Sequence, residues 1–313
     1  MKTILATCTG LALLAGCMGG NASTFAPTAA ARTQSAAQAA GAGSSKQAYL
    51  YVSDFNDSVV RVYTYPQLRL AQTLTGLLGP QGMCADASGN VWVATGSHEL
   101  VEYAPDGSEP IGTLEDPNQN PLNCSVNRRN GDLAVANVFG SNSEGGLAIY
   151  KHARGKPTLY PNGEGYFVGY DDAGNAFLDG LDSFGLVLDE LPKGASKLVS
   201  LNVRGLPSGA FPGDVQWDGD HLAVGNQSTP NGSVIYQMKV RGNAATVIGT
   251  TTLENSSDVA DFLIFGTGAH SRVLGSDVSG SMGIYRYPAG GLPKKILGIP
   301  GGNFTITFPN NTP

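Results

Sequence analysis

The stretch GNVWVATGSHELVEYAPDG (residues 89–107) contains two short apolar runs that are separated by a polar turn and closed by a Pro-Asp-Gly turn. Apolar residues recur in each run with the two-residue period of a strand, not with helical spacing. The pattern occurs six times, and the residue after the first strand of each copy falls at Asp54, Thr95, Asn137, Gly180, Asn226 and Asp277. The intervals are 41, 42, 43, 46 and 51 residues. A repeat of this length built from strands predicts a β-propeller.

A further short strand precedes most copies, for example GMCAD (residues 82–86) and NCSVN (residues 123–127). The first copy, which begins at Leu50, has no such strand ahead of it. GNFTITFP (residues 302–309) can supply the missing strand from the other end of the chain, and closing the ring leaves no unpaired sheet edge. We therefore predict an all-β fold over residues 48–313, a six-bladed β-propeller of four-stranded antiparallel blades closed by the C-terminal strand.

The N-terminal segment has the pattern of an export signal. Residues 1–16 join Lys2 to an apolar run that is too short to span a bilayer, and the sequence LLAGC (residues 13–17) resembles the bacterial lipobox. By that resemblance Cys17 carries the lipid anchor. Residues 17–47 are then the lipidated cysteine and a tether rich in Ala, Gly and Ser, which we expect to be disordered. The protein is expected to be exported and lipid-anchored in the cell envelope, in the outer membrane if the host is Gram-negative.

Composition narrows the classes of partner. The chain has 313 residues, of which 43 are Gly and 18 are Pro, as many tight turns require. Removal of residues 1–16 takes away Lys2 and no acid, which leaves 18 basic and 25 acidic residues and a net charge of −7. This balance argues against nucleic acid as a partner, because nucleic-acid binding depends mostly on neutralising phosphates.

Residues 48–309 resemble the six-bladed propeller class that includes NHL-repeat proteins and the gluconolactonase-like family. LYVSDFNDSVVRVYTYP (residues 50–66), GDVQWDG (residues 213–219) and IYRYPAGG (residues 284–291) are most similar to uncharacterised bacterial propeller lipoproteins. The resemblance implies the fold but little of the function, because propellers include hydrolases, lyases, scaffolds and binding modules. A gluconolactonase-like enzyme would hold one divalent metal in the central channel on Glu, Asn and Asp side chains.

Oxygen-bearing side chains follow the second strands of five units, and we expect them at one mouth of the channel: Asp54, Asn137, Asp179, Asn226 and Asp277. Such ligands suit calcium. The alternative is that these side chains only cap turns by accepting backbone N–H groups. The four histidines fall in different units without metal-ligand spacing, and no Gly-x-Ser-x-Gly motif occurs.

Cys84 and Cys124 lie one register apart on the leading strands of neighbouring units. Because side chains alternate faces along a strand, the two can face each other, and an exported protein is in a compartment where they can oxidise. Two free cysteines packed between blades are the alternative.

Three functions follow as hypotheses. The first is a membrane-anchored, extracytoplasmic lipoprotein whose propeller is a non-enzymatic module for a protein or glycan partner. The alternative is a calcium-dependent lactonase or hydrolase of the gluconolactonase-like type that uses the central channel. A third is a structural spacer in an envelope complex.

Overall fold

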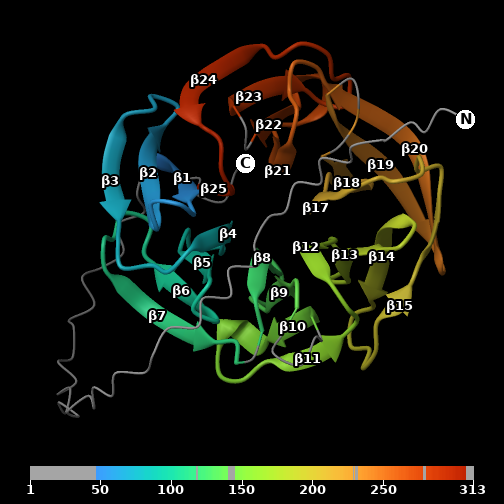
Figure 1. Ribbon diagram of the computed structural model, residues 1–313, viewed down its shortest axis with the longest axis horizontal. Helices are drawn as coiled ribbons and strands as arrows, with labels where there is room; N and C mark the ends of the chain where they lie inside the picture. The colour runs from blue at the N-terminus through green and yellow to red at the C-terminus, as the bar shows by residue number, and fades with distance from the viewer. Residues whose placement is uncertain are drawn as a thin grey trace, which may run out of the picture. The chain divides into compact units, whose positions relative to one another are not determined.

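The computed structural model describes residues 47–117, 119–139, 145–227, 229, 232–277 and 280–307. These residues form six sheets that follow one another around a ring (Figure 1). The predicted all-β six-bladed propeller is therefore confirmed. The signal segment, Cys17 and the tether up to residue 46 lie outside the described residues.

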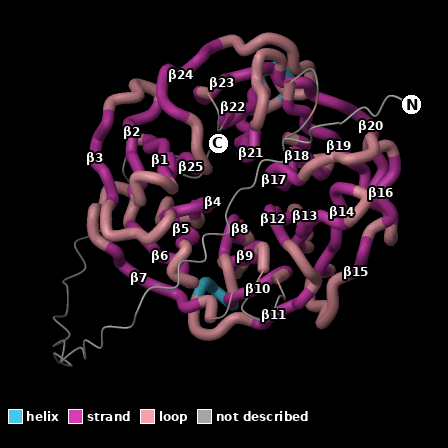
Figure 2. The backbone as a smooth tube through the Cα atoms, in the orientation of Figure 1, coloured by secondary structure: helices cyan, strands magenta, loops and turns pink. Residues whose placement is uncertain are grey.

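Each blade is a sheet whose strands run in order from the channel to the rim (Figure 2). The first three blades consist of β25 (Phe304–Thr307), β1 (Ala48–Asp54), β2 (Val59–Tyr65) and β3 (Leu70–Leu74); β4 (Pro80–Ala85), β5 (Val91–Thr95), β6 (Glu99–Tyr103) and β7 (Pro110–Glu115); and β8 (Pro121–Val126), β9 (Leu133–Asn137), β10 (Gly146–Tyr150) and β11 (Thr158–Pro161). The other three consist of β12 (Gly165–Tyr170), β13 (Ala176–Asp182), β14 (Gly185–Leu191) and β15 (Val199–Ser200); β17 (Pro212–Trp217), β18 (Leu222–Asn226), β19 (Ser233–Arg241) and β20 (Ala244–Leu253); and β21 (Val259–Phe265), β22 (Arg272–Asp277), β23 (Ser281–Arg286) and β24 (Lys295–Pro300).

The C-terminal strand closes the ring as predicted. β25 pairs antiparallel with β1, with Tyr49 opposite Thr307 and Val52 opposite Phe304. The Ser53 N–H also donates to the Asn303 carbonyl at 2.9 Å. The first blade therefore takes its innermost strand from one end of the chain and its other three from the opposite end.

The fifth blade contains a strand that the repeat does not predict. β16 (Asn202–Arg204) lies in the connection that leaves the fourth blade, and it pairs in parallel with the outer strand β20. The connection thus adds a fifth strand to the edge of the next sheet. Pairing in this way covers backbone groups that an outer edge would otherwise leave open.

Buried apolar side chains fill the spaces between neighbouring blades. One cluster joins Tyr51 and Val62 of the first blade to Val93 and Tyr103 of the second. The inner strands approach closely where glycine permits it. A Cβ added at Gly169 on β12 would stand 2.2 Å from the Val215 carbonyl oxygen on β17, so this contact between the fourth and fifth blades requires glycine.

A disulfide joins Cys84 on β4 to Cys124 on β8, with a Cα–Cα distance of 5.6 Å. It lies in the core cluster between the second and third blades, beside Trp92 and Leu133. The bridge ties two inner strands directly together at the wall of the channel. The two cysteines are therefore joined by a disulfide and are not free thiols packed between the blades.

No helix within the part of the chain that the structure describes is both long and apolar enough to cross a membrane.

Candidate functional site: the central cavity

The inner strands of the six blades surround a cavity of about 400 Å³. Its walls include the middle and the ends of the inner strands and the turns that follow them, among them Arg129, Asp172, Gly219 and Gly266. The first residues of five of these strands, such as Pro121 and Val259, are not part of the wall. The cavity therefore opens on the face of the propeller where the inner strands end.

Three inner strands present a polar side chain at the same position: Asn123 on β8, Asp214 on β17 and Asp261 on β21. Each is almost fully buried and accepts a hydrogen bond from a backbone N–H of the next blade. The donors are the N–H groups of Val168 at 3.4 Å, of Phe262, and of Phe304 at 2.9 Å respectively. These side chains therefore join successive blades around the cavity.

The carboxyl groups of Asp214 and Asp261 lie within hydrogen-bonding reach of each other across the boundary between the fifth and sixth blades. Burial raises the pKa of both, and the neighbouring Asp214 raises the pKa of Asp261 further. Two neighbouring carboxyl groups in a buried wall cannot both be ionised at little cost, because the two charges repel each other, so the pair holds at least one proton. With one proton, the pair gives the wall of the cavity one negative charge.

Gln216 fixes the acid pair from the side of β17. Its Nε2 donates to Asp214 Oδ2 at 2.9 Å and also to the Phe262 carbonyl, and its Oε1 accepts the Ile264 N–H at 3.1 Å. One amide side chain thus bridges β17 and β21 beside Asp214. The site is held by hydrogen bonds from both strands.

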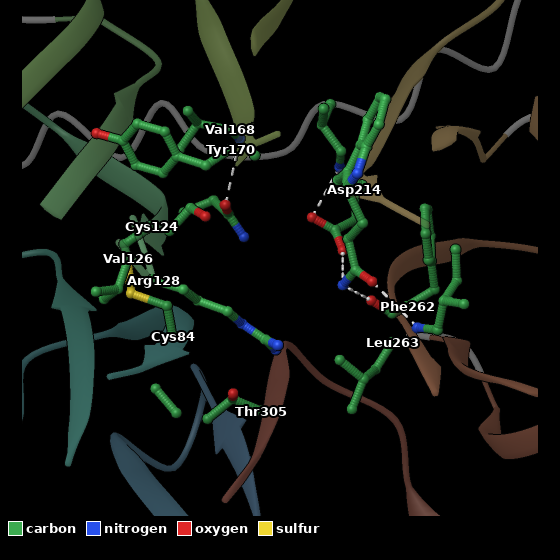
Figure 3. Close-up of a pocket in the computed structure, with 18 of the residues that line it drawn as sticks. Cys84, Cys124, Val126, Arg128, Val168, Tyr170, Asp214, Phe262, Leu263 and Thr305 are labelled. Atoms are coloured by element: carbon green, nitrogen blue, oxygen red, sulfur yellow. Dashed lines mark hydrogen bonds between the residues drawn. A yellow bond between two sulfur atoms is a disulfide. The ribbon is translucent and has the colours of Figure 1, made fainter. Parts of the chain in front are cut away.

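Arg128 comes from the hairpin turn between β8 and β9. The turn is formed by Asn127, whose Oδ1 accepts the Arg129 N–H at 3.0 Å, and by Gly131 with a φ of 74°. The Arg128 side chain extends into the cavity (Figure 3). Its guanidinium has no hydrogen-bond or ion-pair partner among the described residues, whereas Arg61 pairs with both Asp54 and Asp57. Arg128 is exposed at the open side of the cavity, where a guanidinium without a protein partner can bind an anion.

An aromatic side chain lies at the mouth of the cavity. Trp217, the last residue of β17, donates its indole N–H to Asp172 Oδ2 at 2.8 Å, which fixes the ring beside the opening. Tyr170 ends β12 on the same face, but its ring packs against the core cluster between the third and fourth blades. At the mouth the indole ring of Trp217 thus lies beside polar groups, a combination that small-molecule sites commonly have.

None of the five residues of the predicted oxygen ring lines this cavity. They lie at or near the ends of second strands, opposite the beginnings of the inner strands; Asn137 pairs with Pro121 and Asn226 with Pro212. Three of these side chains accept a hydrogen bond from a backbone N–H group: Asp179 from Phe167 at 2.7 Å, Asn226 from Phe211 at 3.0 Å and Asp277 from Ser257 at 2.8 Å. The donors lie on or just before the inner strand of the same blade, 12 to 20 residues away in the sequence. These side chains therefore satisfy backbone groups of the neighbouring strand and do not cap their own turns.

The remaining two ring positions differ from each other. Asp54 accepts the Asp57 N–H at 2.9 Å and pairs with Arg61. Asn137 is buried with its Oδ1 unpartnered, and its amide lies within hydrogen-bonding reach of the buried Asp116. Among the described residues no three His, Cys, Asp or Glu side chains gather as a metal-binding group.

Neither charged feature of the cavity, Arg128 or the Asp214–Asp261 pair, was predicted from the sequence. Arg128 belongs to a hairpin that turn chemistry explains, and its side-chain direction is not encoded in any local pattern. Asp214 and Asp261 could have been found by aligning GDVQW (residues 213–217) with ADFLI (residues 260–264), since both acids then fall at one position. Only the packing of neighbouring blades brings the two carboxyl groups into contact.

Comparison with solved structures supports the fold. A protein of unknown function from Bacteroides caccae matches with a TM-score of 0.60 and 12% identity, over 84% of this chain and 99% of that one. The structure of U3-55K matches with a TM-score of 0.56 and 10% identity, over 73% of this chain and 70% of that one. No protein-family model and no curated protein matches the sequence. At this identity the likeness extends to the propeller architecture and no further.

Proposed function

We propose that the chain is an exported, lipid-anchored binding protein whose central cavity takes a small anionic ligand. The observation that carries the proposal is the Arg128 guanidinium, which extends into the cavity and has no partner among the described residues. A guanidinium binds a carboxylate or phosphate through two parallel N–H···O bonds. The cavity is large enough for a small molecule and is lined by inner strands, which are rigid elements.

The protein as a whole does not attract anions. Its mature net charge is −7, so a long-range field cannot account for anion binding, and a local group has to do so. Arg128 and Arg129 are both on the hairpin after β8, and both belong to the cavity wall. The ligand is therefore expected to be small enough to reach this hairpin through the mouth.

The calcium-dependent lactonase is the less well supported of the two hypotheses. Four of the five oxygen-bearing side chains on which it depended accept backbone N–H groups, and none of the five lines the cavity. The non-enzymatic binding module is supported by a specific group in a specific cavity.

The affinity of full-length protein for small anions tests the proposal. Calorimetric titration with butyrate, succinate and inorganic phosphate should give saturable binding of at least one of them, and Arg128→Gln should weaken it at least tenfold. The reason is that a charge-assisted hydrogen bond contributes roughly 1.5–3 kcal/mol. Arg204→Gln is the control, because Arg204 is exposed on β16 and is not part of the cavity wall. Equal affinities for the wild type and Arg128→Gln would contradict the proposal.

The anchor is tested separately. Replacing Cys17 with Ser removes the thiol that the lipobox resemblance assigns to lipidation, so the protein should move from the membrane fraction to the soluble fraction. Fractionation with a radiolabelled fatty acid measures both location and modification. A Cys17→Ser variant that stays in the membrane, or a wild type without label, would show that Cys17 is not the anchor.

A further inference from the structure

We propose that the cavity is a site for a small zwitterion, with the ligand's anionic group on Arg128 and its ammonium group on the Asp214–Asp261 pair. This inference rests on the proposed function and names the ligand class. The two poles come from different sides of the ring. Arg128 follows β8 of the third blade, and Asp261 lies on β21 of the sixth, which is the opposite blade in a ring of six.

The acid pair is buried in the cavity wall and fixed by hydrogen bonds, unlike a cluster of exposed acids. Asp214 and Asp261 are each only 4% exposed, yet both belong to the cavity wall. Gln216 and the Phe304 N–H fix their orientation. Figure 3 shows Asp214 pointing into the cavity on the side away from the disulfide. A group entering from the mouth therefore meets carboxyl oxygens that are already held in place.

The other acids near the opening are occupied by the protein itself. Asp171 Oδ1 accepts the Gly174 and Asn175 N–H groups at 2.8 Å, and its Oδ2 accepts the Asn175 side chain. Asp218 likewise accepts the His221 N–H and the Tyr287 hydroxyl, each at 2.7 Å. Asp172 accepts the Trp217 indole. The pair on β17 and β21 also accepts protein N–H groups. It differs from Asp218, whose pKa is lowered, because burial raises the pKa of both of its carboxyl groups, so the pair holds a proton that a ligand can displace.

An ammonium group suits this pair because its N–H donors can replace the shared proton. When the ammonium binds, the carboxyl O–H bond of the pair breaks, the proton passes to solvent, and both carboxylates accept N–H···O bonds. The charged groups that face the pair have opposite effects on its ionisation. Arg128 across the cavity favours the ionised pair, whereas Asp179, which lies behind Asp214 on β13, and the acids at the mouth oppose it. Proton release on binding is therefore the characteristic signal of this site.

The charges of the empty cavity also select against simpler ions. With a positive Arg128 and a singly protonated acid pair, a zwitterion adds no net charge. A dicarboxylate would place a second negative charge against the acid pair. A diamine would place a positive charge against the Arg128 guanidinium. Both are expected to bind more weakly than an amino acid of matching length.

Calorimetry with an amino-acid series tests the inference on the full-length protein. Glycine, β-alanine, γ-aminobutyrate and 6-aminohexanoate vary the spacing of the two charges, phosphoethanolamine supplies a phosphate in place of the carboxylate, and butyrate and butylamine carry one charge each. The best zwitterion should bind at least tenfold more tightly than butyrate. Titrations at pH 6 in buffers of different ionisation enthalpy should show that ligand binding releases protons.

Asp261→Asn separates the two poles, because the amide oxygen can still accept the Phe304 N–H while one of the two carboxyl groups of the pair is lost. This variant should reduce proton release, since only Asp214 still titrates in the pair, and should weaken the zwitterion at least tenfold, with butyrate binding unchanged. If the variant does not fold, proton release by the wild type still decides the question. Butyrate and the zwitterions binding equally, in an Arg128-dependent way and without proton release, would overturn this inference and leave the proposed function standing. Failure of every anion to bind would overturn both.

Discussion

Deletion of residues 302–313 is expected to cause the largest loss of stability of any change to this protein. It removes β25, leaves the channel edge of β1 unpaired and takes away Phe304 and Ile306, which are 3% and 5% exposed. Burial of the two side chains alone contributes roughly 3–6 kcal/mol, against a total of roughly 5–15 kcal/mol for a typical domain. The truncated chain should aggregate or unfold near room temperature, as size-exclusion chromatography and urea denaturation would show.

Deletion of residues 308–313 is the matched control, since these residues lie beyond β25. It should leave the urea midpoint and the monomer peak unchanged. A chain ending at residue 301 that stayed monomeric with the wild-type midpoint would mean that the ring does not depend on its C-terminal strand.

The second large effect concerns pH: the free energy of unfolding should fall as the pH rises from about 4 to 8. Burial raises the pKa of Asp116 to about 6 and raises those of Asp179, Asp214 and Asp261 as well. A group with a raised pKa in the folded state contributes stability that is fully present below its unfolded pKa and is lost as the pH passes its folded pKa. For Asp116, a shift from 3.8 to about 6 corresponds to about 3 kcal/mol.

Asp54 and Asp218 have lowered pKa values and act in the opposite direction, gaining stability as the pH rises through the acidic range. The buried acids outnumber them, so we expect the net slope to be negative. Urea denaturation at intervals of pH measures it.

Asp116→Asn isolates one of the buried acids. Both oxygens of Asp116 are buried, and the Tyr150 hydroxyl and the Asn137 amide lie within hydrogen-bonding reach of the carboxyl group. The buried Asn137 Oδ1 has no partner and can accept from the new amide. The variant should be more stable than the wild type at pH 8 by up to about 3 kcal/mol and similar to it at pH 4. Asp106→Asn, at an exposed position, should change neither value. A wild type that grows steadily more stable up to pH 8 would show that these carboxyl groups are not held neutral.

The propeller could be predicted because the same local sequence pattern recurs in every blade. The apolar alternation and the turns at residues such as Asn127 and Gly131 are local features, and six copies indicate the ring. Closure by β25 followed from counting strands. β16 could not be foreseen, since its three residues have a partner only because the next blade places β20 alongside them.

The site could be predicted much less well. Asp54, Asn137 and the other ring residues share a place in the repeat, but that place is the opposite end of the blades from the cavity mouth. An oxygen-bearing side chain after a strand satisfies a nearby N–H group as readily as it binds a metal. Asp214 and Asp261 stand in strands that the sequence does indicate, yet their contact depends on how two blades pack.

A crystal structure of the full-length protein soaked with saturating γ-aminobutyrate would locate the ligand itself. We expect density for the ligand inside the cavity, with its carboxylate on the Arg128 guanidinium and its amino group beside Asp214 and Asp261. A cavity that holds only solvent at a saturating concentration of this ligand, or a ligand bound only outside the cavity, would contradict this expectation.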